Sequence, residues 1–221
     1  MKEIIKLFNE VGMLEGILET LYMVFISTFI SFIVGIALGI LCRITDKDGL
    51  RPLKMVNRIL DIIINIGRSI PFIILMLALT PFIKFLIGKS YGVNASVVAL
   101  TIAAIPFVSR LVYISIKDID YTLVESVKVM GATVWQIIYR VYLVETIPAM
   151  IRNFSLTLIT LVGYSAMAGA IGGGGIGNIA MVYGYHRFDK QVMLMALVII
   201  VIIVQIMQVS FEKLAKKIDK K

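Results

Sequence analysis

Charged residues are scarce in this chain of 221 residues. Asp, Glu, Lys and Arg together make up 16% of the positions, whereas hydrophobic residues make up 59%. So few charges cannot cover the surface of a soluble domain of this length, and a composition this apolar is typical of a membrane protein. The composition therefore excludes an ordinary soluble globular domain.

The residue types that carry most catalysis and metal binding are also nearly absent. The chain has one cysteine, Cys42, which cannot form a disulfide within the chain, and one histidine, His186. His186 stands beside Arg187 in an expected outer loop, where a solvated side chain is a simpler interpretation than a metal ligand or a catalytic base. No Walker motif, metal-ligand cluster or nucleophile with a base at a recognisable spacing is present. We therefore expect no enzymatic activity and no bound cofactor or metal.

The chain does contain long stretches without a charged residue. Asp, Glu, Lys and Arg are missing from residues 20–42, 90–109, 153–185 and 191–211. A helix needs about 20 apolar residues to cross the hydrocarbon core of a bilayer, and each stretch is long enough. One such stretch could be a buried helix of a soluble core, but four together predict a polytopic membrane protein.

A fifth apolar segment, residues 59–83, carries two charges, Asp61 and Arg68. A charge in the middle of the membrane costs about 2.5–3.5 kcal/mol. Either this span is tilted and Arg68 extends to the interface, or the membrane portion begins near Ser69 and the preceding turns lie in the interface. The charges thin out gradually from Arg51 to Arg68, which favours the second arrangement. The same pattern favours an interfacial anchor over a pathway role for Arg68.

The predicted fold is all-α, a single membrane domain with the N-terminus outside and the C-terminus in the cytoplasm. The five predicted spans lie at about residues 18–42, 59–83, 90–113, 152–172 and 191–211. They divide the loops into two sets, one with fourteen Lys and Arg residues and one with six. Because cytoplasmic loops are richer in these residues, the first set is predicted to be inside. This bias explains most of the net charge of +8 without a nucleic-acid partner, and residues 213–221 are expected to lie near anionic lipid.

The longest polar interlude, residues 114–150, falls on the predicted cytoplasmic side. In it Glu125 is followed six positions later by Gly131, within a segment that resembles short amphipathic helices. A bilayer does not require such a segment, so we expect it to contact a partner in water. Glu125 would accept hydrogen bonds from a basic partner or cap the first turn of its own helix, and both interpretations stay open. Gly131 would end or bend that helix, and Trp135 and Tyr139 would anchor a second one.

A glycine-rich run occupies residues 169–177. It cannot be a phosphate-binding loop, because no Lys-Ser or Lys-Thr follows it and no strand precedes it. Glycine permits positive φ and close backbone approach, so a break in helix geometry is expected. Irregular backbone at membrane depth is tolerated where it is buried in protein or lines a cavity. The run is therefore either part of an external gate, through Gly173 and Gly174, or a plain surface turn.

Polar residues interrupt the fourth predicted span. They are Ser155, Thr157, Thr160, Tyr164 and Ser165, followed by Met167. Polar groups at this depth need partners, and hydrogen bonds to neighbouring helices are one explanation while substrate contact is another. The candidate pathway and gate residues are Arg68, Thr160, Tyr164, Ser165, Met167, Gly173 and Gly174.

Several segments resemble the permease subunits of ABC importers, in particular the methionine-importer (MetI) type. Glu125 followed by Gly131, in a loop between two spans, is similar to the EAA loop of importer-type ABC permeases. Closer similarity lies in residues 68–75, 130–133 and 158–167 and continues through 172–177 and 183–185. The resemblance covers nearly the whole chain and implies the fold of an importer permease.

In the family that the chain resembles, the EAA loop forms a coupling helix that seats in a groove on a separate cytoplasmic ATPase. The resemblance assigns this role to Glu125, Ser126, Lys128, Met130, Gly131, Ala132 and Thr133. It also implies two ATPase copies that bind ATP and Mg²⁺, an extracytoplasmic substrate-binding protein, and a second copy of the chain to complete the pathway. The family usually has alanines where this chain has Ser126 and Val127, and proline where it has Val144. Detailed ATPase contacts therefore cannot be carried over.

The resemblance implies an ATP-driven importer in the plasma membrane of a prokaryote, with methionine as the expected cargo. A permease for another small nutrient would share the coupling loop and is an alternative. An ATP-independent secondary transporter is a more remote alternative, because such proteins typically carry intramembrane carboxylates or inverted repeats. Asp61 is the only acidic residue near a predicted span interior, and no internal repeat is evident.

Overall fold

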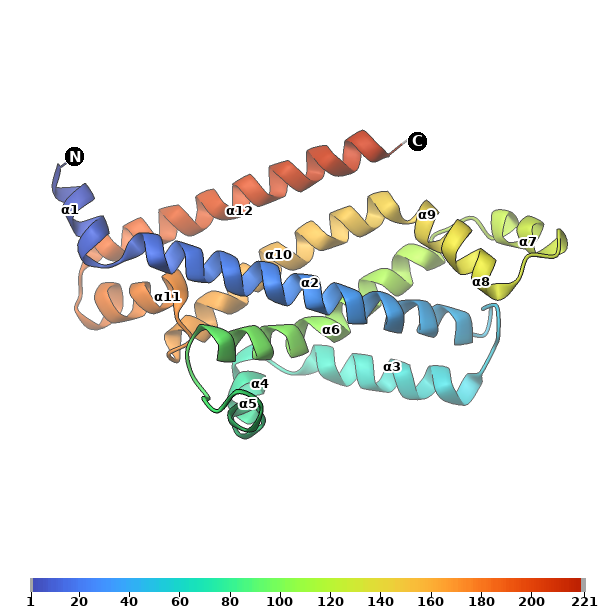
Figure 1. The fold of residues 1–221 in the computed structure, drawn as a ribbon, viewed down its shortest axis with the longest axis horizontal. Helices are drawn as coiled ribbons and strands as arrows, with labels where there is room; N and C mark the ends of the chain where they lie inside the picture. Colours follow the sequence, from blue (N-terminus) through green and yellow to red (C-terminus); the bar gives the residue numbers. More distant parts are fainter. Residues whose placement is uncertain (1, 220–221) are drawn as a thin grey trace.

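Four long helices run side by side along the length of the molecule (Figure 1). The structure is a computed structural model that describes residues 2–219, and these residues contain helices but no strand. The long helices are α2 (Met13–Thr45), α6 (Val93–Lys117), α10 (Ile147–Ala170) and α12 (Lys190–Ile218). Each overlaps one of the four charge-free stretches. The segments long and apolar enough to cross a membrane are α2, α6, α12 and the longer segment Ile147–His186, which begins with α10.

The segment expected as the second span is broken rather than continuous. Helix α3 (Lys54–Ser69) and helix α4 (Phe72–Ala78) meet at an angle of 102°. The break falls at Ile70, which is extended (ψ 123°) because the following Pro71 disfavours helical backbone before it. A short helix, α5 (Thr80–Ile87), follows. The bent α3–α4 pair makes a fifth span only if the two helices are counted together.

The remaining helices gather at the two ends of the molecule (Figure 1). One end, here the α11 end, holds α1 (Lys2–Glu10), α11 (Gly175–Ile179) and the π-helix η2 (Ala180–His186). The opposite α7 end holds α7 (Tyr121–Val129), α8 (Val134–Ile137), the π-helix η1 (Ile138–Tyr142) and α9 (Leu143–Glu145). The C-terminal half of α12 points toward the α7 end, and Lys220 and Lys221 of the predicted lipid-binding cluster lie outside the described residues.

Helices α2 and α6 share the most extensive contact in the fold. A Cβ atom on Gly35 would lie 2.5 Å from Cγ1 of Val108, and one on Gly39 would lie 2.6 Å from Cγ1 of Val112. Only glycine leaves room for so close an approach. Because lipid tails are as apolar as leucine, this close packing, rather than removal of surface from water, holds the two helices together.

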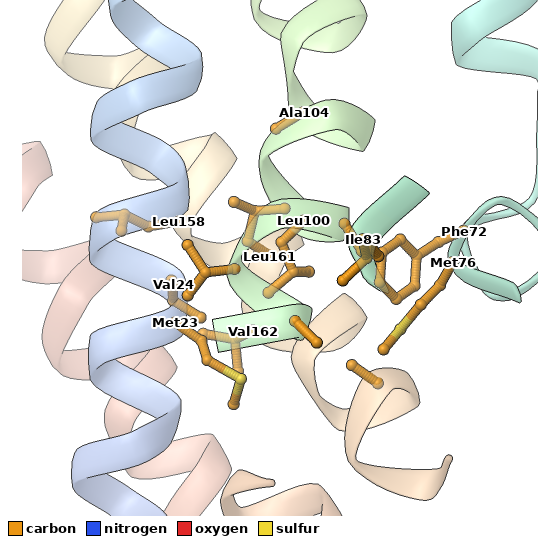
Figure 2. Close-up of a cluster of buried hydrophobic side chains, with 14 of the residues drawn as sticks. Met23, Val24, Phe72, Met76, Ile83, Leu100, Ala104, Leu158, Leu161 and Val162 are labelled. Carbon is orange, nitrogen blue, oxygen red and sulfur yellow. The ribbon is translucent and has the colours of Figure 1, made fainter. Parts of the chain in front are cut away.

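The main apolar cluster lies where the bent segment meets the long helices (Figure 2). Its labelled members are Met23 and Val24 of α2, Leu100 and Ala104 of α6, Leu158, Leu161 and Val162 of α10, and Phe72, Met76 and Ile83 of α4 and α5. All of these side chains are buried. The cluster therefore fixes the position of α4 and α5 relative to the long helices, and with it the position of the bend.

Candidate functional site

The predicted coupling loop folds into a helical hook at the α7 end. Helix α7 begins at a cap in which the Asp120 carboxylate accepts a hydrogen bond from the Thr122 N–H at 2.9 Å. Glu125 lies in the middle of α7 and is exposed, so the interpretation of Glu125 as the cap of its own helix is wrong. No hydrogen bond or ion pair among the described residues involves its carboxylate, which is therefore open to a partner.

Gly131 ends α7, as expected. Its φ of 84° is a left-handed conformation that favours glycine, and its N–H donates to the Lys128 carbonyl at 3.0 Å. Thr133 then starts α8 through a capping box: its N–H donates to Oε1 of Gln136 at 2.8 Å, and its hydroxyl accepts from the Gln136 N–H at 3.4 Å. These bonds make the connection between α7 and α8 short and well defined.

The hook has one anchored face and one free apolar face. Val124 and Ile137 are buried in a cluster that also contains Ile116 of α6. Outside this cluster, Val129 is 82% exposed and Met130 76% exposed. Trp135 and Tyr139 are exposed as well, and their rings stack at a centroid distance of 6.1 Å. Apolar side chains gathered on an exposed face, held by a rigid turn, are typical of a protein–protein contact surface.

A hydrogen bond at the α7 end of the molecule joins α6 to the loop that follows α2. The Tyr113 hydroxyl of α6 donates to the Asp46 carboxylate at 2.7 Å. Burial alone would raise the pKa of Asp46, but this bond, the Lys47 N–H and the nearby Lys117 ammonium together hold the pKa below its ordinary value. A charged Asp46 thus ties the loop after α2 to the helix that leads into the hook.

At the α11 end the glycine run is clasped by α2 and α6. The Glu19 carboxylate accepts a hydrogen bond from the Gly175 N–H at 2.6 Å, and the Thr20 hydroxyl accepts one from the Ile176 N–H at 2.9 Å. From α6, the Ser96 hydroxyl donates to the Gly173 carbonyl at 3.0 Å. We call these three contacts the glycine clasp.

The glycine clasp excludes a plain surface turn for the run. Gly173 and Gly175 are buried, and Gly174 and Gly175 have φ values of 84° and 76°. A Cβ atom on Gly173 would lie 2.6 Å from the Ala168 carbonyl oxygen, and one on Gly174 would lie 2.8 Å from Cγ2 of Val93. The run is a tightly packed link between α10 and α11, which the conformational freedom of glycine makes possible.

Glu19, Thr20 and Ser96 of the clasp were missed by sequence reasoning. The signal was present, because Glu19 is the last charge before the charge-free stretch that begins at Thr20. An acidic residue at the edge of a span is a candidate partner for the free N–H groups at a helix start. Which helix start it would meet could not be read from a sequence separation of 156 residues.

The predicted polar residues of α10 fall on two different faces. One face of α10 is exposed or partly exposed and carries Leu156, Thr160, Gly163 and Met167. Ser165 lies outside this face and is buried. The Thr160 hydroxyl donates to the Leu156 carbonyl, and the Ser165 hydroxyl donates to the Val162 carbonyl, both at 2.8 Å. Hydrogen bonding to neighbouring helices, one of the two explanations considered, is therefore wrong for these two residues. Their partners are carbonyls of their own helix.

Arg68 and Tyr164 meet at a cavity beside the α3–α4 bend. The cavity has a volume of about 130 Å³ and is lined by Gly67, Arg68, Ile70, Phe72, Leu75, Ala103, Phe107 and Tyr164. The Tyr164 ring stacks on Phe72, with centroids 4.8 Å apart and planes inclined by 6°. Of the predicted pathway residues, the structure brings these two together. Thr160, Ser165 and Met167 do not line the cavity, and Gly173 and Gly174 belong to the clasp at the α11 end.

Residues 31–220 match the family described as binding-protein-dependent transport system inner membrane component. The chain belongs to this family. Its helical fold, with four apolar spans and a bent fifth, agrees with an integral component of a membrane transport system.

Named relatives within the family are methionine permeases. The chain is 48% identical over 170 residues to the probable D-methionine transport system permease protein MetI of Pasteurella multocida, covering 77% of this chain and 78% of that protein. It is 42% identical over 203 residues to the methionine import system permease protein MetP of Bacillus subtilis, covering 92% and 91%.

A solved structure of the MetNI methionine ABC transporter, in an inward-facing conformation, contains a similar chain. The TM-score is 0.93 at 39% sequence identity, over 94% of this chain and 96% of that one. This similarity and the family match confirm the expected importer-permease fold, and they identify the chain as an ABC transporter permease.

Proposed function

We propose that this chain is the permease subunit of an ATP-driven importer for methionine. Two copies would enclose the translocation pathway, two copies of a separate ATPase would bind beneath them, and a substrate-binding protein would deliver cargo from outside. ATP and Mg²⁺ would be held by the ATPase, and this chain would bind no cofactor. The support for methionine is that relatives at 48% and 42% identity carry methionine in their names.

The observation that carries the coupling role is the hook formed by α7 and α8. It joins two membrane helices, it is closed by the capping box at Thr133, and it turns an apolar face with Met130 and Trp135 away from the fold. A permease without a nucleotide site must receive the work of ATP hydrolysis through a stiff contact of this kind. Glu125, without a partner of its own within the described residues, would accept hydrogen bonds from a basic group of the ATPase.

The proposed orientation places the α7 end in the cytoplasm of a prokaryote and the α11 end outside. The lysines and arginines support it, since the loop between α2 and α3 and the end of α12 are both rich in these residues. The ATPase surface and the glycine clasp would then lie on opposite sides of the plasma membrane.

The test is co-purification of the tagged chain from its native membrane, with and without Glu125→Lys. Reversing the charge should reduce recovery of the ATPase at least tenfold while leaving the yield of the chain in the membrane unchanged. Glu145→Lys, a charge reversal in α9 outside the assigned coupling residues, is the matched control. Recovery of the wild-type chain alone, in gentle detergent and repeatedly, would overturn the ABC assignment.

The cargo is tested separately, by uptake in vesicles that hold the whole transporter. Excess unlabelled L-methionine or D-methionine should abolish uptake of labelled methionine, whereas polar amino acids should not. Uptake of a different nutrient, with the ATPase still bound, would support the alternative of a permease for another small solute.

A further inference from the structure

Arg68 lies at the level of the centre of α6. The end of α3 packs on the centre of α6, because a Cβ atom on Gly67 would lie 2.6 Å from Cγ of Pro106. The cavity beside Arg68 is lined on α6 by Ala103 and Phe107. Ala103 is ten residues from the start of α6 and Phe107 ten residues from its end, or about 15 Å from either at 1.5 Å per residue. A hydrocarbon core is about 30 Å thick. A hydrocarbon core centred on α6 would place Arg68 near the middle of the membrane rather than at the interface, where it was expected as an anchor.

The Arg68 side chain has no charged partner at this depth. None of the ion pairs or side-chain hydrogen bonds of residues 2–219 involves it. The other arginine on this part of the helix pair, Arg110, is paired with Asp61 at 3.4 Å and lies over the Tyr113 ring at 5.0 Å. An ionisable residue inside the membrane typically faces a watery cavity and marks a substrate or ion pathway. Arg68 is exposed and borders a cavity.

The cavity combines one cation with aromatic and aliphatic lining residues. Arg68 is its only charged lining residue, while Phe72, Tyr164 and Phe107 contribute aromatic rings. A guanidinium binds a carboxylate through two parallel hydrogen bonds. Aromatic rings accept apolar side chains and make favourable contacts with thioether sulfur. The volume of about 130 Å³ is below the 300–1,000 Å³ typical of ligand pockets, so it suits one small solute or part of it.

We infer that Arg68 binds the carboxylate of the transported amino acid at a subsite in the middle of the membrane, where Phe72 and Tyr164 contact its apolar side chain. A lipid phosphate is an unsuitable occupant, because headgroups lie at the interface, about 15 Å from this depth. The inference rests on the proposed function, since it takes an amino acid as the cargo. It adds a place inside this chain where the cargo is held after delivery.

Binding is tested on the purified permease–ATPase complex without the substrate-binding protein. Methionine should raise the thermal midpoint of the wild-type complex, whereas methioninol, in which an alcohol replaces the carboxylate, should not. Arg68→Gln should weaken the apparent affinity for methionine about 10- to 100-fold, the range expected for losing a hydrogen bond to a charged group. Arg68→Lys should restore part of it. Arg58→Gln, on the same helix nearer the α7 end, is the matched control and should bind as the wild type does.

The outcomes separate this inference from the proposed function. If the wild-type complex assembles and takes up methionine, but methioninol stabilises it as well as methionine does, carboxylate recognition is overturned and the importer assignment stands. Unchanged affinity in Arg68→Gln overturns the inference in the same way. Should Arg68→Gln fail to assemble, the comparison of methionine with methioninol on the wild type still decides. A wild-type complex that takes up no methionine overturns both.

Discussion

Replacing Glu19 by glutamine should loosen the glycine clasp without removing the side chain. The Gly175 N–H donates to the Glu19 carboxylate at 2.6 Å in a partly buried position. A hydrogen bond to a charged group contributes about 1.5–3 kcal/mol and a neutral one about 0.5–1.5 kcal/mol, so Glu19→Gln should cost about 1 kcal/mol. For a chain of this length, that loss lowers the thermal midpoint by about 2–4 °C.

The neighbouring contact provides a second perturbation of the same link. Thr20→Val keeps the shape of the side chain but removes the acceptor for the Ile176 N–H, which is bonded at 2.9 Å and buried. Leaving a buried donor unsatisfied costs about 1–3 kcal/mol, so this variant should be destabilised at least as much as Glu19→Gln.

The assay is hydrogen exchange at the amides of Gly175 and Ile176 in the purified protein, followed by mass spectrometry. Both variants should exchange faster at these amides while the centre of α6 stays protected. The matched control is Glu15→Gln, an exposed carboxylate one turn earlier on α2. Exchange at Gly175 that is equal in the wild type and in Glu19→Gln would refute the argument that this carboxylate holds the run in place.

Three further outcomes are expected. Gly173→Leu should reduce uptake at least tenfold with the ATPase still bound, because a side chain there collides with Ala168 and Ser96; unchanged uptake would contradict a gating role for the run. A cysteine at position 88 should be labelled from outside the cell and one at position 47 should not, and the reverse pattern would overturn the orientation. Tyr113→Phe should lower the thermal midpoint at pH 7 by removing the bond to Asp46. Because the pKa of Asp46 is held low in the folded protein, the charged form stabilises the fold above its ordinary titration range, and the difference from the wild type should fade below about pH 4. A difference independent of pH would show that the Asp46 charge is not involved.

The features of the hook show how far local sequence reaches. Gly131 was expected to end a helix, and it does so with a φ of 84°. The capping box was equally readable, since Thr133 is followed three positions later by Gln136, but it was overlooked. Both features depend only on residues within one turn of each other. Of the two interpretations left open for Glu125, the cap failed because Asp120, five positions earlier, already holds that place.

Arg68 shows what a local pattern does not contain. The gradual thinning of charge before it resembles the approach of a chain to the membrane surface. In the structure, α3 instead packs alongside α6, and the contact of Gly67 with Pro106 carries Arg68 to the level of the middle of that helix. The depth of a residue in a bundle depends on the register between helices, which a hydropathy pattern does not contain.

The sequence by itself determined that the chain is a helical membrane protein and where its long helices run. These features depend only on local sequence. A charge-free apolar stretch in a bilayer forms a helix, because each backbone N–H must find its hydrogen-bond partner within the same segment. Only the tertiary structure decided which distant groups meet. The clasp of Glu19 on Gly175, across 156 positions, and the cavity shared by Arg68 and Tyr164 both arise from the packing of whole helices against one another.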